Sequence, residues 1–178
     1  MLLAALLGAA CGGPSVKSDW ERKNEALLEK EDGGPLPAPP TFPRQENLVE
    51  FSVGAARDFR FFIDRTSLSV GDDRVVRYVL VARTADGVDN VSFEAMRCAT
   101  SEYRVYALGR PDGSWAGRAR EWRPIAARNV QHWHVALRRE YFCPQNLPIQ
   151  SADEGVRALE QGGHPFVKGF SGDALRGR

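Results

Sequence analysis

Residues 75–83 read Val-Val-Arg-Tyr-Val-Leu-Val-Ala-Arg, and this stretch organises the rest of the fold. In an extended chain, successive side chains point to opposite faces. One face of this stretch would carry Val76, Tyr78, Leu80 and Ala82, and the other Val75, Val79 and Val81. Strands that are apolar on both faces are covered on both faces. The sequence therefore predicts a central strand over residues 75–83.

Further strands are predicted on both sides of this one, because the same alternation continues. A strand is expected between Phe59 and Val70, another around residues 91–95, and a fourth around residues 103–107. Turn-forming residues separate them, at 71–73, 86–87 and 111–113. Such short connections favour antiparallel pairing, since parallel strands need crossovers of a dozen or more residues.

Two helices are expected after the strands. Apolar residues recur at helical spacing from Asn129, a suitable N-cap, to Cys143, where Pro144 ends the helix. A capping box at residues 151–154 begins a shorter helix that Gly162 and Gly163 end. The predicted fold class is α+β. It comprises a small antiparallel sheet of about four to six strands with one packed C-terminal helix, stapled by a disulfide.

Composition and charge limit the class of protein. Lys and Arg number 24 against 23 Asp and Glu, a formal net charge of +1. A dedicated nucleic-acid binder would be strongly basic, so no nucleic-acid partner is expected. No apolar run reaches the roughly 18 residues that a membrane-spanning helix needs. We divide the chain into a lipoprotein signal segment (1–11), a tether with a short helix and a proline-rich spacer (12–43), a folded domain (44–143) and a C-terminal extension with a short helix (144–178).

The signal segment indicates export. Residues 2–10 are uncharged and apolar, and Cys11 follows Ala9 and Ala10 directly. This arrangement resembles a bacterial lipobox, although Leu7 stands four residues before the cysteine rather than three. The resemblance implies lipidation of Cys11 and a lipid anchor in the membrane. Gly12, rather than Asp, follows the cysteine, which implies the periplasmic side of the outer membrane. The alternative is a buried N-terminal helix with an incidental cysteine.

Cysteine usage agrees with export. If Cys11 carries lipid, Cys98 and Cys143 remain, and two cysteines in an oxidising envelope are expected to pair. The alternative is a pair of buried free thiols in a cytosolic core.

Arginine is the unusual feature of the predicted domain. Residues 44–143 contain 16 arginines and no lysine. Arg118, Arg120 and Arg123 lie beside Trp122, and the arginine fork binds carboxylates and phosphates and stacks on aromatic rings. The sequence predicts a weak anion-binding site there, for an anionic envelope component. The alternative is that these arginines only solvate one face of the sheet.

Catalytic and metal-binding residues are sparse. His132 and His134 are two apart, so on a helix they do not face each other, and we expect no metal and no cofactor. Asp64, Glu94, Glu102 and the two histidines are the ingredients available to a hydrolase or transferase that acts on envelope polymers. No phosphate-binding or dinucleotide-binding motif is present.

Four segments within residues 44–143 carry a resemblance to a known family: residues 59–64, 75–83, 103–106 and 141–144. With these segments the chain resembles the bacterial cryptic neisserial protein-like family of exported proteins. The resemblance implies an exported protein or lipoprotein, and it supplies no catalytic residues. The expected function is that of a non-enzymatic binding or structural module of the cell envelope that contacts an anionic component or another envelope protein. The hydrolase or transferase is the alternative.

Overall fold

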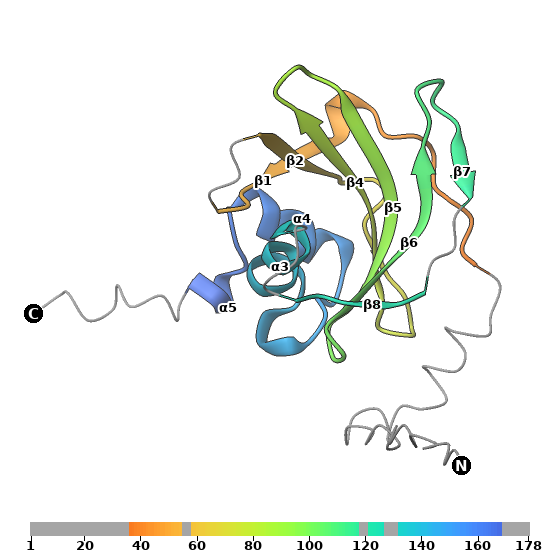
Figure 1. Ribbon diagram of the computed structural model, residues 1–178. Helices are drawn as coiled ribbons and strands as arrows, with labels where there is room; N and C mark the ends of the chain where they lie inside the picture. Colours follow the sequence, from red (N-terminus) through yellow and green to blue (C-terminus); the bar gives the residue numbers. More distant parts are fainter. Residues whose placement is uncertain (1–35, 55–57, 118–120, 127–131, 169–178) are drawn as a thin grey trace, which may run out of the picture.

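The computed structural model describes residues 36–54, 58–117, 121–126 and 132–168 (Figure 1). The strands are β1 (Leu48–Phe51), β2 (Phe59–Asp64), β3 (Ser69–Val70), β4 (Val76–Thr84), β5 (Asp89–Arg97), β6 (Glu102–Gly109), β7 (Trp115–Gly117) and β8 (Arg123–Pro124). The helical elements are η1 (Gln45–Asn47), α3 (His132–Ala136), η2 (Leu137–Phe142), η3 (Pro144–Asn146), α4 (Ala152–Glu160) and α5 (Pro165–Lys168).

Within the described residues the strands form one antiparallel sheet in the order β1-β2-β4-β5-β6-β7. In addition, β3 pairs with β4 and β8 pairs with β6. The α+β class is confirmed, but this sheet of eight strands is larger than the predicted four to six. The long strands β2, β4, β5 and β6 match the alternation in the sequence. The additional strands have two to four residues, which is too short for a periodic pattern to show.

The strand predicted between Phe59 and Val70 is wrong in its second half. It ends at Asp64, whose Oδ1 accepts hydrogen bonds from the backbone N–H of Thr66 at 3.0 Å and from its hydroxyl at 2.8 Å. This side-chain turn competes with strand pairing. The chain then reverses, and β3 pairs with β4.

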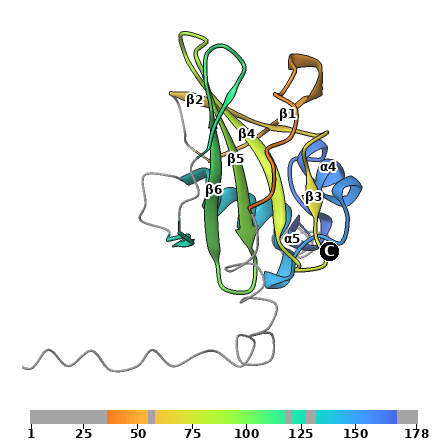
Figure 2. The ribbon, with the colours of Figure 1, turned by 90° about the vertical axis from the view of Figure 1, so that its right-hand side faces the viewer.

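The sheet is covered on both faces, as predicted from β4. On the inner face, helices α3, η2 and α4 pack against the sheet, which curves around them (Figures 1 and 2). The inner-face core includes Phe61, Ile63, Val76, Tyr78, Leu80, Met96, Leu137, Tyr141, Phe142, Ile149 and Leu159. The outer face has its own buried cluster of Phe62, Val75, Val79, Val81, Val91, Phe93, Ala95, Tyr106 and Ala107.

The helix expected to end at Cys143 is present as α3 followed by η2. Its predicted start, at residues 129–131, lies outside the described residues. In η2 the turns are wider than in an α-helix, because the N–H of Cys143 donates to the carbonyl of Arg138, five residues earlier.

Helix α4 begins with the predicted capping box. The hydroxyl of Ser151 accepts from the N–H of Glu154 at 3.2 Å, and the Glu154 carboxylate accepts from the N–H of Gln150 at 2.6 Å. Ala158 and Leu159 on this helix are almost fully buried. Residues beyond 143 therefore contribute to the inner-face core.

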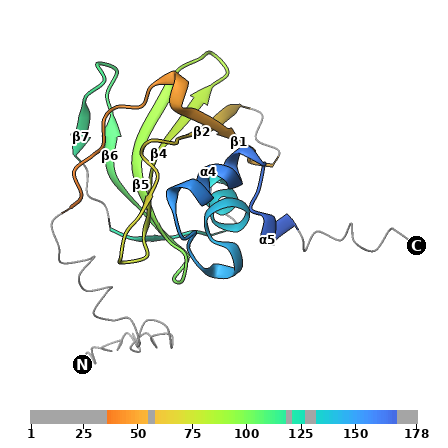
Figure 3. The same cartoon turned by 180° about the vertical axis from the view of Figure 1, so that it is seen from behind.

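Residues 36–47, which we call the strap, cross the outer face from β7 to β1 (Figure 3). The indole Nε1 of Trp115 donates to the carbonyl of Pro40 at 2.8 Å, and the rings of Phe42 and Trp115 lie 5.2 Å apart. Phe42 packs over Gly109, where a Cβ atom would lie only 2.8 Å from the phenyl ring. The described part of the proline-rich spacer thus lies against the sheet.

Candidate functional site

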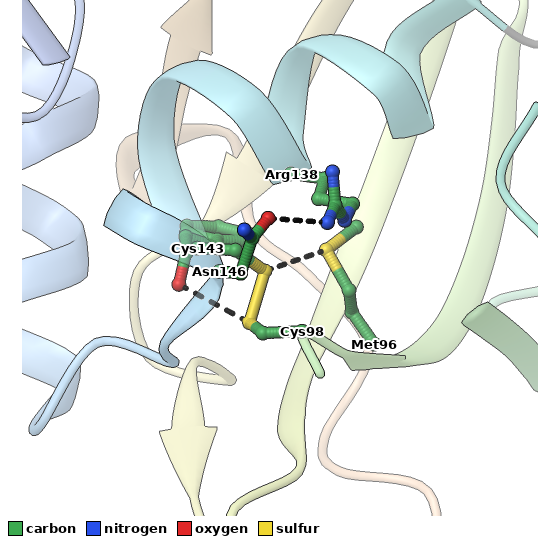
Figure 4. The surroundings of a disulfide bond; sticks show 6 residues. Met96, Cys98, Arg138, Cys143 and Asn146 are labelled. Carbon is green, nitrogen blue, oxygen red and sulfur yellow. Dashed lines mark hydrogen bonds between the residues drawn. A yellow bond between two sulfur atoms is a disulfide. The ribbon is translucent and has the colours of Figure 1, made fainter. Parts of the chain in front are cut away.

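The disulfide between Cys98 and Cys143 is confirmed (Figure 4). Cys98 follows β5 and Cys143 follows η2, so the bridge ties the end of the helix to the sheet, with 5.3 Å between the two Cα atoms. Both cysteines are buried, and Met96 Sδ lies 3.6 Å from Cys143 Sγ. Cys11, the predicted lipidation site, lies outside the described residues, as do the rest of the signal segment and the tether up to residue 35.

A buried acid–histidine pair joins β5 to α3. Nε2 of His134 lies 2.7 Å from Oε2 of Glu94, and the hydroxyl of Ser92 donates to Oε1 of Glu94 at 2.7 Å. The ring of Tyr103, from β6, stacks on the imidazole with 3.8 Å between centroids. The histidine and glutamate side chains are 2% and 4% exposed. The pair therefore lies inside the core, where a substrate has no direct access.

The phenol of Tyr78 lies beside this pair, because the strand register places Tyr78 opposite Glu94. Its burial raises the pKa of the Tyr78 phenol, and the neighbouring Glu94 carboxylate raises that pKa further. The phenol is therefore kept in its neutral form. Nδ1 of His134 is buried and has no hydrogen-bond partner among the described residues. The described hydrogen bond between the two side chains is therefore made through Nε2 of His134.

The remaining catalytic ingredients have other partners. Asp64 forms the turn after β2, and Glu102 accepts from the hydroxyl of Thr100 at 2.6 Å. His132 is exposed on α3 while His134 is buried, so the two histidines point apart, as their spacing predicts. Within the described ranges, no three His, Cys, Asp or Glu side chains are grouped so that they could hold a metal ion.

A second cluster, of arginines and aromatic rings, lies on the outer face at the opposite end of the sheet from the β4–β5 turn. The Cζ of Arg97 is 4.0 Å from the ring centroid of Trp122. The Cζ of Arg104 is 5.8 Å from the same centroid and 5.6 Å from that of Tyr106. We call these four residues the arginine–tryptophan cluster. Guanidinium groups at such distances from aromatic faces are attracted to them, more strongly where water is excluded.

Strand register explains how the cluster forms. Ala95 and Arg97 of β5 are opposite Arg104 and Glu102 of β6, so Arg97 and Arg104 share the outer face. In β8, Arg123 is opposite Tyr103, and continuing that antiparallel register by one residue places Trp122 across from Arg104. Trp122 therefore lies on the same face as both arginines, within reach of each guanidinium group.

An acid borders the cluster: Oε2 of Glu102 lies 3.9 Å from Nη1 of Arg97. Nε1 of Trp122 and Nε of Arg104 are buried, and no described residue accepts a hydrogen bond from either. The indole N–H of Trp122 and the two guanidinium groups form surroundings that favour an anion.

The structure describes only part of the predicted anion site. Arg118 and Arg120 lie outside the described residues, and Trp122 belongs to the arginine–tryptophan cluster. Arg123, the first residue of β8, is exposed, and because it directly follows Trp122 in an extended segment its side chain points to the other face. Arg97 and Arg104 were not predicted as site residues, because they are distant from Trp122 along the chain. Alternation within β5 and β6 would have placed them on one face, but only the pairing of β8 brings Trp122 to them.

Among the described residues, no helix is long and apolar enough to cross a membrane. The fold and the clusters define a disulfide-linked α+β domain with a basic, aromatic patch on its outer face. The chain belongs to the CNP1-like family, whose family model matches residues 30–160. The match extends beyond residues 44–143 at both ends and includes the strap and α4, both of which pack on the sheet. Comparison with curated proteins and with solved structures gave no match.

Proposed function

We propose that this chain is a cell-envelope lipoprotein whose domain is a non-enzymatic binding module, with the arginine–tryptophan cluster as its contact for an anionic envelope component. The cluster is the observation that carries the proposal, because it brings two guanidinium groups against aromatic faces and includes two buried N–H groups, of Trp122 and Arg104, that have no acceptor among the described residues. Arg118, Arg120 and Arg123 add to the positive charge of the neighbouring sequence. The ligand group is a phosphate or carboxylate, which the arginine fork binds bidentately.

The disulfide supports the location. Structural disulfides persist in oxidising compartments such as the bacterial periplasm and are rare in the cytosol. A lipid on Cys11 would hold the domain at the periplasmic side of the outer membrane.

Mass analysis of the protein purified from its native membrane tests this location. We expect a mature chain that begins at Cys11, carries acyl chains on that residue and has Cys98 and Cys143 oxidised. A chain recovered from the cytosol with Met1 in place and three free thiols would contradict the location. A Cys11→Ser variant is the control, and it should lose both the acylation and the membrane association.

Binding to inorganic polyphosphate, an anion without any apolar part, tests the cluster. We expect saturable binding that weakens as salt is added, because ionic contacts are screened. Arg104→Gln should weaken the binding about tenfold, since a hydrogen bond to a charged group contributes roughly 1.5–3 kcal/mol. Trp122→Leu should also weaken it, because the indole positions Arg97.

Arg65→Gln is the matched control for this experiment. Arg65 is a partly exposed arginine that pairs with Glu160 at 3.0 Å, away from the cluster. If Arg65→Gln and Arg104→Gln reduce polyphosphate binding equally, the anion is attracted by overall charge and the cluster is not a site.

The alternative function, hydrolysis or transfer on envelope polymers, would use Glu94 and His134, a histidine and a carboxylate that meet in the core. It requires the core to open at α3, since both side chains are almost fully buried. The geometry therefore favours the binding module.

A further inference from the structure

A cavity of about 710 Å³ lies at the end of the outer face remote from the arginine–tryptophan cluster. Phe42 of the strap and Leu48, the first residue of β1, form one wall, and the sheet forms the opposite wall, with Val81 and Val91. The turns after β4 and β6, which lie at the same end of the sheet, line its rim. This volume lies within the range of small-molecule sites, which are mostly apolar with a few polar groups at defined places.

The charged groups on the cavity lining differ in whether they already have a charged partner. The single acid on its lining is Asp89, and both carboxylate oxygens accept from Arg83, at 2.6 and 2.9 Å. The same arginine also donates to the amide oxygen of Gln45 at 2.8 Å. The negative charge of Asp89 is thus neutralised by a close bidentate partner.

The single cation on the lining is Arg110, at the start of the turn after β6. Its Nη1 donates to uncharged oxygens, the hydroxyl of Ser114 at 3.3 Å and the carbonyl of Trp115 at 3.0 Å. The nearby carboxylate of Asp112 accepts from the N–H and the hydroxyl of Ser114. Arg110 therefore keeps donors for an additional anionic group, while the Asp112 carboxylate, whose pKa is lowered by its hydrogen bonds from Ser114 and by Arg110, offsets part of its charge.

We propose that this cavity binds the hydrocarbon chain of a single-chain anionic amphiphile, such as a fatty acid or a lysolipid, with the anionic head group against Arg110. The apolar walls accept the chain, because burying hydrocarbon surface is favourable. The packing of Phe42 over Gly109 keeps the strap in place as the outer wall. The site is separate from the arginine–tryptophan cluster and goes beyond the proposed function.

Calorimetric titration of the full chain with dodecanoate, below the concentration at which it forms micelles, tests this site. The chain carries Cys11→Ser, so that the added probe supplies the only acyl chain. We expect saturable binding with one site, and we expect hexanoate to bind more weakly because it buries less hydrocarbon surface. The absence of saturable dodecanoate binding would overturn the proposal.

Variants of the wall and rim locate the bound probe. Leu48 lines the cavity and packs on the outer-face cluster, so Leu48→Trp takes up cavity space and should weaken dodecanoate binding at least about tenfold, the effect of a loss near 1.4 kcal/mol. Val88 lines the cavity and is 59% exposed, so Val88→Asp should weaken binding without a penalty to folding. Leu147→Trp is the control, because Leu147 is 55% exposed and does not line the cavity. Equal binding by all three variants would place the probe elsewhere and contradict the proposal.

The head group is tested with Arg110→Gln. This variant should weaken dodecanoate binding about tenfold and leave binding of 1-dodecanol unchanged, because only the carboxylate has a charge to lose. An equal loss for both probes would contradict the role of Arg110. Polyphosphate binding should be unaffected by Leu48→Trp, so failure of the cavity and failure of the arginine–tryptophan cluster are separate results.

Discussion

Replacing Cys98 and Cys143 together by alanine is expected to lower the free energy of unfolding by about 4 kcal/mol. The bridge spans a sequence separation of 45 residues, and a loop of that length removes considerable freedom from the unfolded chain. The bridge also holds η2 against β5, at a place where both cysteines are nearly inaccessible. The loss is a large fraction of the 5–15 kcal/mol that stabilises a typical domain.

Urea denaturation followed by circular dichroism measures this loss. The transition should move to lower urea, and its slope should increase, because an unfolded chain without the cross-link exposes more surface. Cys11→Ser is the control and should leave the transition unchanged. A double variant that unfolds within 1 kcal/mol of the native chain would show that the bridge does not stabilise the domain.

The second large effect is expected at Glu94 and His134. His134→Leu leaves a carboxyl buried in the core with the hydroxyl of Ser92 on one of its oxygens, and it should cost about 3–5 kcal/mol, as for a broken buried pair. Glu94→Leu leaves an imidazole N–H without its acceptor and should cost less, about 1–3 kcal/mol. The double replacement removes both polar groups together and should cost less than the sum of the two single losses.

Chemical denaturation of the two single variants and the double variant measures the coupling between these residues. We expect at least about 1 kcal/mol of non-additivity, since residues in direct contact couple by roughly 0.5–3 kcal/mol. Phe93→Leu, which alters the outer face of the same strand, is the control and should be additive with His134→Leu. Strict additivity of Glu94→Leu and His134→Leu would contradict the contact between the two side chains.

The sequence predicts the centre of this fold well and its edges poorly. Alternation over residues 75–83 predicted a strand covered on both faces, and β4 contributes to both buried clusters. The pairing of Cys98 with Cys143 followed from the number of cysteines. The short strands β3 and β8 have two residues each, so they exist only because a longer neighbour offers them hydrogen bonds. No local pattern could have indicated them.

The candidate sites depend on the same long-range pairing. Trp122 was predicted as a site residue because arginines stand beside it in the sequence. Its described guanidinium contacts are instead with Arg97 and Arg104, which come from other strands. Glu94 and His134 were both recognised as chemically able residues, but their contact requires α3 to lie across β5. The sequence shows which residues have suitable side chains. Which of them lie close together across the sheet depends on the strand register, and the site residues alone do not determine that register.

The strap has a mechanical consequence for a domain that is held by its amino-terminal side. A pull on the chain ahead of Leu36 reaches the folded part first at Pro40 and Phe42, which are fixed to Trp115 and Gly109. Force therefore enters at the β6–β7 edge, through the Trp115–Pro40 hydrogen bond and the packing of Phe42, and next at Gln45, which accepts from Arg83, before it loads the hydrogen bonds of β1. The strap would therefore detach under tension before the sheet does. Its detachment would leave the disulfide-linked core folded.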